Sequence, residues 1–365
     1  MKKVLIIRNA FSHDFGGAEI HALNLAIELK KNNYEPVLMT RVPALLERCK
    51  ENGIKHQRGL WYSRQGWGRF YKIFGRFIVI WYILIIRLKK IDLVHAHSRD
   101  DFVFATKAAK LLGVKVVWTD HADLKYIMKK NNSPDLRSSI VELASYATRV
   151  IIVSNSEKLE VIKQYPAFPN IQVIHNGVIV PEKISKIKKP KKIIIGCTNR
   201  LVKAKGIAEL IEGYSKINNI ERTELWLLGD GEDRAVFEDL TKRLDITKNV
   251  KYLGYKRSVW GYLAVFDIFV QPTYHEAFSN SLVEASVSEC AVIATNVGGN
   301  SEIINSKNGI LISPKDPRAI TSAINKFIEN PLLMKEYSVK LKKLTLNEYD
   351  FDRIVKEKVI PIYEN

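Results

Sequence analysis

Short apolar runs alternate with amphipathic stretches along the whole chain. In its first half the apolar runs are 4–8, 36–40, 92–97, 115–120, 149–154 and 171–175. Stretches with a helical period, such as 18–31 and 100–113, lie between them. Strand and helix in alternation are typical of a parallel sheet covered by helices on both faces. The first half therefore predicts an α/β, doubly wound, Rossmann-like domain.

The segment 181–192 interrupts this alternation, because it holds two prolines and six lysines in twelve residues and no sustained apolar period. After it the apolar runs resume at 192–197, 224–229, 250–254, 267–272, 291–295 and 309–313. A chain of 365 residues is also longer than one hydrophobic core usually serves. The pattern thus predicts two Rossmann-like domains facing a central cleft, with ligand bound at the carboxyl ends of the strands. We place the first domain at 1–183, the linker at 184–192 and the second domain at 193–348. Residues 349–365 form a helical tail, and one option is that this tail packs on the first domain.

The positive charge is concentrated in the first half of the chain. The net charge is +18, and residues 1–188 carry 31 Lys and Arg against 16 Asp and Glu, a net +15. Residues 189–365 carry 26 against 23, a net +3. This excess favours an anionic partner for the first domain, either a membrane with acidic lipids or an acidic substrate. Nucleic acid is not expected, since no binding motif accompanies the charge.

The segment 74–90 differs from the other helical stretches. It contains ten consecutive apolar residues, 77–86, bounded by Arg76 and Arg87. A membrane-spanning helix needs roughly 20 apolar residues, so this run is too short to cross a bilayer. Two alternatives stay open: a helix lying in the membrane interface, and a helix buried against the sheet.

The cysteines and the N-terminus indicate a reducing, cytoplasmic environment. The three cysteines are widely spaced, odd in number and without a CxxC pair. After Lys2 and Lys3 the apolar run 4–7 is too short for the core of a signal peptide. We therefore expect a first β-strand of a cytoplasmic protein.

Two carboxylates stand eight positions apart in the second half. Glu276 follows the predicted strand 267–272, and Glu284 lies near the start of the next predicted helix. Such carboxylates can face a sugar and accept hydrogen bonds from a ribose, while the helix N-terminus near Asn280 and Ser281 suits a phosphate. The alternative is a capping box from Ser281 to Glu284, in which the glutamate only caps its own helix.

Two further groups occur where strands are predicted to end. Arg200 and Lys205 follow the strand 192–197, where a diphosphate would need cations. Gly16 and Gly17 follow the first strand and open a helix, where glycine lets the backbone approach a ligand. A solvated basic pair and a simple turn are the alternatives, and neither a Walker A motif nor a dinucleotide fingerprint occurs.

Taken in order, these motifs resemble the retaining glycosyltransferases of the GT-B architecture, specifically glycosyltransferase family 4. The resemblance runs from Gly16 to about Ile304. Its elements are GGAE (16–19), VHAHS (94–98), TDHAD (119–123), VSNSEK (153–158), VIHNGV (173–178), NRLVKAKG (199–206), LLGDGEDR (227–234), the glutamates of E-x7-E, and VGGNSEII (297–304).

The resemblance implies a role for each matching residue in binding the donor. Gly16 and Gly17 would lie beside the donor phosphates, and Arg200 and Lys205 would clamp the diphosphate. The backbone of Ser279, Asn280 and Ser281 would also bind phosphate.

Glu276 would contact the donor sugar and Glu284 the ribose. His121 would reach the transferred sugar near the reaction centre. Tyr255 or Lys256, just after the strand 250–254, is our candidate for a contact with the base.

No metal is expected. His95 and His97 alternate on one strand without a nearby cysteine, and no Asp-x-Asp motif occurs. The basic pair would then neutralise the leaving diphosphate. One departure from the family pattern is Ala277, where glycine usually follows the first glutamate; a positive φ there would strain an alanine.

The resemblance implies a retaining glycosyltransferase that uses a nucleotide diphosphate sugar, with uridine as the expected base. We expect it to transfer a hexose or N-acetylhexosamine to a glycan acceptor, lipid-linked or membrane-displayed, in cell-surface polysaccharide biosynthesis. No cofactor beyond this co-substrate is expected, and the enzyme would be cytoplasmic and peripheral to the membrane. The alternatives are a sugar-nucleotide 2-epimerase and a catalytically silent partner subunit.

Overall fold

The computed structural model describes residues 1–9, 16–60, 68–121, 124–128, 134–185 and 187–365. The chain divides into two compact units. Unit 1 comprises Met1–Asn176 and Phe351–Asn365, and unit 2 comprises Gly177–Asp350. The two units are described separately below.

Unit 1 is built on a sheet whose described strands are all parallel and run in the order β3-β2-β1-β4-β5-β6-β7. This order reverses at β1 and β4, as in a doubly wound fold. The strands are β1 (Lys3–Ile7), β2 (Glu35–Thr40), β3 (Lys55–Arg58), β4 (Leu93–Ala96), β5 (Lys115–Asp120), β6 (Arg149–Ile152) and β7 (Ile171–Val173). The helices are α1 (Gly17–Lys31), α2 (Pro43–Glu51), α3 (Gly68–Lys89), α4 (Arg99–Leu112), α5 (Leu124–Ile127), α6 (Pro134–Tyr146) and α7 (Asn155–Gln164).

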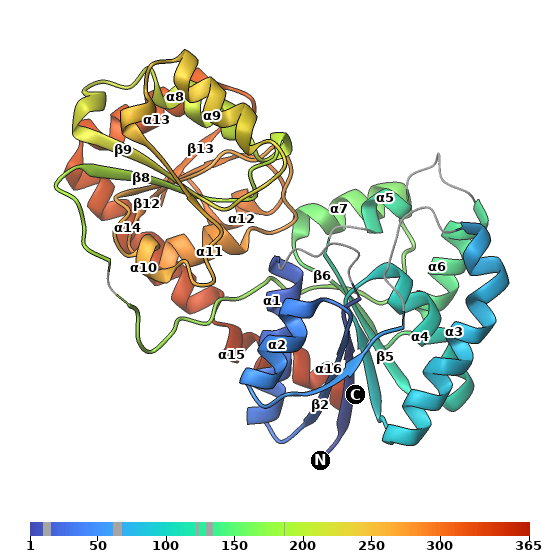
Figure 1. Cartoon of the computed structure of the whole chain (residues 1–365). Helices are drawn as coiled ribbons and strands as arrows, with labels where there is room; N and C mark the ends of the chain where they lie inside the picture. The colour runs from blue at the N-terminus through green and yellow to red at the C-terminus, as the bar shows by residue number, and fades with distance from the viewer. Residues whose placement is uncertain (10–15, 61–67, 122–123, 129–133, 186) are drawn as a thin grey trace. The chain divides into compact units, whose positions relative to one another are not determined.

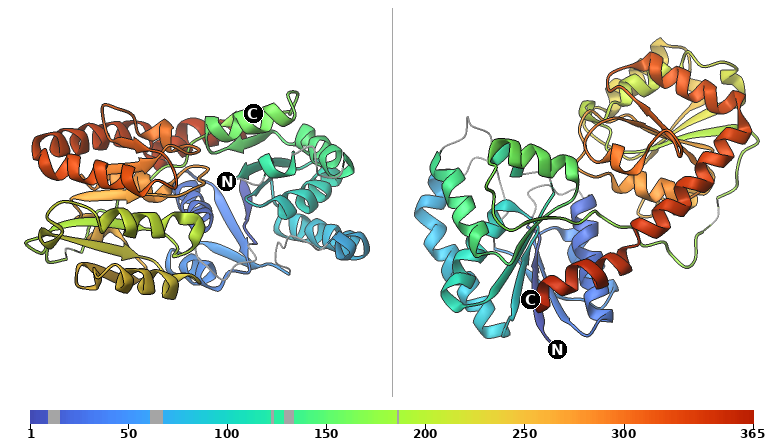
Figure 2. Two further views of the ribbon diagram at one scale, coloured as in Figure 1. Left: turned by 90° about the horizontal axis from the view of Figure 1, so that it is seen from above. Right: turned by 180° about the vertical axis from the view of Figure 1, so that it is seen from behind.

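Helices cover both faces of this sheet (Figure 1). On one face, α3, α4 and α6 pack on alternate strand residues, and the fully buried Trp118 of β5 stacks on Phe102 of α4. The other face carries α1, α2 and the C-terminal segment (Figure 2). That segment comprises α15 (Phe351–Ile354), the π-helical turn η4 (Val355–Val359) and α16 (Ile360–Glu364).

The C-terminal segment is anchored to unit 1 by buried side chains. The ring of Phe351 packs edge-on against His21 of α1 at a centroid distance of 5.3 Å. The hydroxyl of Tyr363 lies 2.6 Å from Nδ1 of His95 on β4. The end of the chain therefore completes a face of the first sheet.

Unit 2 holds a second sheet whose described strands are also parallel, in the order β10-β9-β8-β11-β12-β13. The strands are β8 (Ile193–Thr198), β9 (Thr223–Leu228), β10 (Val250–Gly254), β11 (Ile268–Gln271), β12 (Ala291–Thr295) and β13 (Ile310–Ile312). The helices and helical turns are η1 (Lys203–Lys205), α8 (Ile207–Tyr214), η2 (Ile220–Arg222), α9 (Arg234–Arg243), η3 (Thr247–Asn249), α10 (Trp260–Leu263), α11 (Asn280–Val287), α12 (Asn300–Ile303), α13 (Pro317–Glu329) and α14 (Pro331–Glu348).

The core of unit 2 lies between this sheet and its helices. Leu210 of α8, Phe237 of α9 and Ile324 of α13 pack on one face, in one cluster with Ile195 and Leu227 of the central strands. The predicted fold class, two doubly wound parallel sheets with helices on both faces, is confirmed. The domain limits at 183, 184–192 and 349 remain predictions, and the limits of the two compact units do not test them.

Candidate donor-binding site and histidine cluster

Lys205 and Glu276 lie together at the carboxyl edge of the second sheet. Nζ of Lys205 lies 2.7 Å from Oε2 of Glu276, and both side chains are about one-fifth exposed. Lys205 ends the turn η1 after β8, and Glu276 lies on the loop after β11, so two neighbouring strands bring them together. The structure thus pairs two of the predicted site residues, although they are 71 positions apart in the sequence.

A glycine permits this approach of the two loops. Gly206, which follows Lys205, has φ +69, a conformation that glycine adopts without strain. A Cβ atom there would lie 2.1 Å from the carbonyl oxygen of Pro272. The loop that carries Lys205 therefore packs against the end of β11 only because this position has no side chain.

The side-chain amides of Asn199 and Gln271 form a chain of hydrogen bonds beside this ion pair. Nδ2 of Asn199 donates to Oε1 of Gln271 at 2.8 Å. Nε2 of Gln271 donates to Oγ of Ser279 at 3.0 Å and lies 3.5 Å from Oε2 of Glu276. Asn199 and Gln271 were not predicted. Each is a single polar residue at the end of a buried strand, and such a residue does not by itself indicate a functional site.

Ser279 is the N-cap of α11. Its backbone is extended, and its Oγ accepts a hydrogen bond from N of Leu282 at 3.2 Å. Asn280 and Ser281 are therefore the first two helical residues, whose N–H groups point out of the N-terminal end of the helix. Oγ of Ser281 donates to the carbonyl of Thr198 at the end of β8. The positive end of the helix dipole thus lies at the same sheet edge as Lys205.

This cap position contradicts one alternative from the sequence. A capping box between Ser281 and Glu284 requires Ser281 to be the N-cap, but the helix begins two residues earlier. Glu284 is instead the fifth helical residue, past the first turn where we expected it. Desolvation raises the pKa of its carboxyl to about 7. Glu284 is partly exposed, so a ligand can still reach this residue.

The loop around Glu276 is fixed by its neighbour Gly298. Gly298 has φ +52, and a Cβ atom there would lie 1.5 Å from the carbonyl oxygen of Glu276. N of Gly299 donates to the carbonyl of Ala277 at 3.1 Å. Ala277 itself is absent from the described non-glycine residues with positive φ, so the strain considered for this alanine does not arise. The glycine required here is Gly298.

Arg200, Tyr255 and Lys256 lie at the same edge of the sheet. Arg200 follows β8 and is exposed. Tyr255 follows the edge strand β10 and is 57% exposed. Nζ of Lys256 lies 5.6 Å from the centre of the Tyr262 ring. Their roles in binding phosphate and base stay predictions.

An acidic residue that the sequence did not single out as a ligand fixes the turn η1. Oδ2 of Asp233 accepts a hydrogen bond from N of Lys203 at 2.7 Å. Asp233 is also the N-cap residue of α9. It therefore holds the segment that presents Lys205.

In unit 1, Gly16 and Gly17 open α1. Gly16 is the N-cap with φ −121, an ordinary extended conformation, so a left-handed turn is not the reason for glycine there. N of Gly16 donates to Oε2 of Glu19 at 3.0 Å, and Oε1 of Glu19 accepts from Nε of Arg8 at 2.7 Å. The glycine pair thus lies next to a partly buried ion pair at the carboxyl end of β1.

His121 belongs to a cluster of four imidazoles at the carboxyl edge of the first sheet. Nε2 of His121 lies 3.2 Å from Nδ1 of His97, and their rings stack. His97 stacks on His95 at 4.5 Å, and His21 of α1 packs edge-on against His121 at 5.2 Å. Nε2 of His97 is buried and makes no hydrogen bond. The sequence placed His95 and His97 on one face of a strand, but not His21 or His121 beside them.

Burial keeps these rings neutral. Desolvation lowers the pKa of His21 to about 4 and that of His95 to about 3. It also holds the pKa of His97 and of His121 well below the usual value, and the neighbouring imidazoles add to this effect. A neutral His121 donates a hydrogen bond from its protonated ring nitrogen and accepts one at the other nitrogen, without carrying charge.

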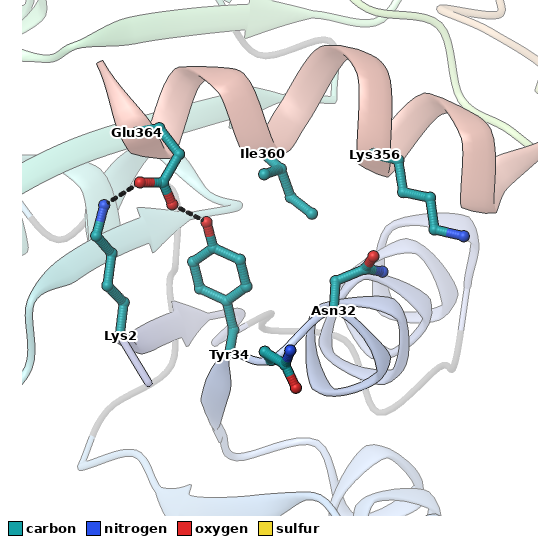
Figure 3. A pocket seen from close by; sticks show the side chains of 7 residues that line it. Lys2, Asn32, Tyr34, Lys356, Ile360 and Glu364 are labelled. Atoms are coloured by element: carbon teal, nitrogen blue, oxygen red, sulfur yellow. Dashed lines mark hydrogen bonds and ion pairs between the residues drawn. The ribbon is translucent and has the colours of Figure 1, made fainter.

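A separate pocket of about 420 Å³ lies at the opposite edge of unit 1 (Figure 3). Lys2, Tyr34 and Glu364 line it, and the Glu364 carboxylate accepts hydrogen bonds from Nζ of Lys2 and from the hydroxyl of Tyr34 (Figure 3). Lys2 and Tyr34 immediately precede β1 and β2, so the pocket lies at the amino ends of the strands. It therefore contains none of the predicted site residues.

Among the residues that the structure describes, no group of three or more His, Cys, Asp or Glu is arranged to hold a metal ion. The expectation that no metal takes part stays a prediction. The site residues described here offer cations, amides and helix N–H groups, which suit an anionic ligand.

Comparisons with known proteins show the family to which the chain belongs. Residues 15–180 match the model for Glycosyltransferase Family 4, and residues 180–344 match the model for Glycosyl transferases group 1. The uncharacterised glycosyltransferase MJ1607 of Methanocaldococcus jannaschii is 27% identical, with 94% of this chain and 93% of that protein covered. The phosphatidylinositol N-acetylglucosaminyltransferase GPI3 subunit of Saccharomyces cerevisiae is 26% identical, with 89% and 75% covered.

The fold has close counterparts among solved structures. The Anabaena protein HepE in complex with UDP-glucose superposes with a TM-score of 0.80 at 20% identity, over the full length of both chains. The two matching sheets and the motif order define a GT-B glycosyltransferase that uses a nucleotide sugar. The chain belongs to glycosyltransferase family 4, the glycosyl transferases group 1.

Proposed function

We propose that this enzyme transfers a hexose or N-acetylhexosamine from a UDP-sugar to a membrane-displayed or lipid-linked glycan acceptor, with retention and without a metal ion. The observation that carries the donor part is the juxtaposition of Lys205, Glu276 and the N-terminus of α11 at one sheet edge. UDP-glucose is the ligand named for HepE, and phosphatidylinositol is named for GPI3. These names support the donor and the lipid acceptor as proposals for this chain.

In this proposal the leaving diphosphate is stabilised by fixed positive groups. Lys205, Arg200 and the N–H groups of Asn280 and Ser281 would share its charge as the bond to the sugar breaks. Fixed donors cost no reorganisation at the moment of reaction, so they can replace a metal ion in this role. The acceptor hydroxyl would then attack from the face on which the diphosphate leaves, and its proton would pass to an oxygen of the departing diphosphate.

The carboxylates would bind the uncharged parts of the donor. Glu276, held by Lys205 and Gln271, would accept hydrogen bonds from the sugar hydroxyls. Glu284 would accept them from the ribose diol. His121, kept neutral by burial, would lie near the reacting carbon, as the resemblance to the family implies.

Substitution of the ion pair tests this proposal. We expect Lys205→Ala and Glu276→Ala each to abolish transfer from a UDP-sugar while the far-ultraviolet circular dichroism stays unchanged. Lys203→Ala is the matched control, since Lys203 is an exposed lysine on the same turn and is not a member of the ion pair. Full activity in either of the first two variants would overturn the assignment.

A second assay separates the transferase from the epimerase and from a silent subunit. The donor is incubated without acceptor and the products are separated by chromatography. A free isomerised nucleotide sugar would indicate a 2-epimerase, and failure to bind any nucleotide sugar in a thermal-shift screen would indicate a silent subunit. We expect binding of a UDP-sugar and no isomerised product.

A further inference from the structure

Helix α3 presents large apolar side chains to solvent along one face. Phe77 is 67% exposed and Leu88 is 78% exposed. We call this surface the outer α3 face, and it comprises Phe74, Phe77, Ile80, Leu84 and Leu88. Because these residues recur every three or four positions, they lie on one side of the helix. Five exposed large apolar residues on one helix form a contiguous patch, which soluble surfaces rarely carry without a partner.

The opposite face of α3 is already used by the core. Ile78, Tyr82 and Ile86 are buried against the first sheet and α4. The hydroxyl of Tyr82 donates to Oδ1 of Asp101 at 3.1 Å, and a Cβ atom on Gly75 would lie 3.2 Å from the ring of Phe104. The inner face is therefore fixed in place. The alternative of a helix buried against the sheet therefore holds for the inner face only, because the opposite side of α3 is exposed.

The charge along this part of the chain is uniformly positive. Between Glu51 and Asp92 the sequence contains nine Lys and Arg and no Asp or Glu. Among the described side chains, Arg76, Arg87 and Lys90 are exposed. Arg76 and Arg87 are eleven residues apart, about three helical turns, so they point in nearly the same direction and border the outer face. An apolar stripe bordered by cations complements a surface that is both apolar and anionic.

We propose that the outer α3 face binds the surface of an anionic membrane, with the helix lying in the plane of the interface. Among the described residues, no helix has the length and apolar character needed to cross a bilayer. The aromatic and aliphatic side chains would enter the boundary between headgroups and acyl chains, and the cations would contact lipid phosphates. A protein partner with a flat apolar face would not explain the absence of acidic residues over this stretch.

The direction of α3 relates the proposed membrane contact to the carboxyl edge of the first sheet. The helix connects β3 to β4, which run parallel in the sheet, so α3 starts at the carboxyl edge of the sheet. His97 and His121 lie at that edge. Membrane binding through α3 would bring a membrane-displayed acceptor toward it. This purpose rests on the proposed function, whereas vesicle binding and donor use are measured separately.

Co-sedimentation of the full chain with vesicles tests the proposal. We expect binding to vesicles of equal parts phosphatidylglycerol and phosphatidylcholine at low salt, with much weaker binding to phosphatidylcholine alone. The variant F77Q/L84Q/L88Q should weaken binding roughly tenfold or more. The matched control L159Q/V236Q/L332Q replaces exposed apolar residues of α7, α9 and α14, and it should bind as the wild type does.

A charge variant separates the two contributions. R76Q/R87Q/K90Q should also weaken binding to anionic vesicles roughly tenfold or more, while K163Q/K248Q/K307Q, exposed lysines elsewhere, should leave it unchanged. Thermal unfolding and binding of a UDP-sugar by each variant show that the fold and the donor site are intact.

Three outcomes would overturn the proposal. The first is that the wild type stays in solution with anionic vesicles at low salt. The second is that F77Q/L84Q/L88Q binds as tightly as its matched control. The third is a concentration-dependent dimer in analytical ultracentrifugation that this variant abolishes, because the outer face would then bind a second copy of the chain. Loss of vesicle binding with intact transfer to a soluble acceptor would leave the donor chemistry standing.

Discussion

The buried histidine His95 should make unit 1 sensitive to acid. Its ring is 1% exposed, and it lies between the hydroxyls of Tyr363 and Thr119, at 2.6 and 2.7 Å. Burial lowers its pKa from 6.5 to about 3, and the imidazoles of His97, which follows β4, and of His21 on α1 lie next to it. The folded protein therefore keeps this ring neutral at pH 5, whereas the unfolded chain protonates it.

The size of the effect follows from proton linkage. Because the folded pKa is depressed, the stability contributed by the neutral ring is complete above pH 6.5 and is lost as the pH falls toward 3. At pH 5, which is about 1.5 units below the pKa of 6.5 in the unfolded chain, protonation of His95 stabilises the unfolded chain. The stabilisation is roughly 1.36 kcal/mol for each of these units. His95 alone should thus lower the free energy of unfolding by about 2 kcal/mol between pH 8 and pH 5.

Urea unfolding at the two pH values measures this difference. The experiment is best done in a Trp226→Phe, Trp260→Phe background, since the remaining tryptophans then all belong to the range of unit 1. His95→Gln removes the titrating ring and should reduce the pH-dependent loss by about 2 kcal/mol. Comparing variant with wild type cancels the contributions of carboxylates, which both proteins share.

His56→Gln is the control, because this histidine is exposed in the folded protein. It should leave the pH dependence as in the wild type. If His95→Gln loses as much stability between pH 8 and pH 5 as the wild type does, burial does not hold the ring neutral and the reasoning is wrong.

Three further predictions concern the donor site. Glu284 has a pKa of about 7, so if its ionised form binds the ribose, affinity for a UDP-sugar in calorimetry should fall about tenfold from pH 8 to pH 6, and Glu284→Gln should remove this dependence. Gly298→Ala should abolish transfer in a radiolabelled-donor assay, because its Cβ would collide with the Glu276 carbonyl; Gly113→Ala, with a similar φ and open space, should retain activity. Asp233→Ala should weaken donor affinity roughly two- to tenfold by freeing the turn η1, and an unchanged dissociation constant would contradict that role.

Several elements could be predicted from the sequence because their signal is local. Buried parallel strands are short apolar runs, and both β10 and β12 have the predicted limits 250–254 and 291–295. The strand β3, with the sequence KHQR, was missed. It lies at the edge of the sheet with mostly exposed side chains, so it needs no apolar residues.

The helix α3 shows where a local signal is ambiguous. Its ten apolar residues are consistent with a buried helix and with an interfacial one, because periodicity disappears when both faces are apolar. Only the packing on α4 and the sheet distinguishes Tyr82, which is buried, from Leu84, which is exposed.

By itself the sequence determined the alternation of strands and helices, the excess of charge in the first half, and the order of motifs that places the chain in its family. These properties depend on residues close together in the chain. The tertiary structure decided which distant residues meet. It paired Lys205 with Glu276, made Ser279 the N-cap of α11 and stacked His121 on His97. Such contacts depend on how parallel strands align at one edge of a sheet, and no local pattern records that alignment.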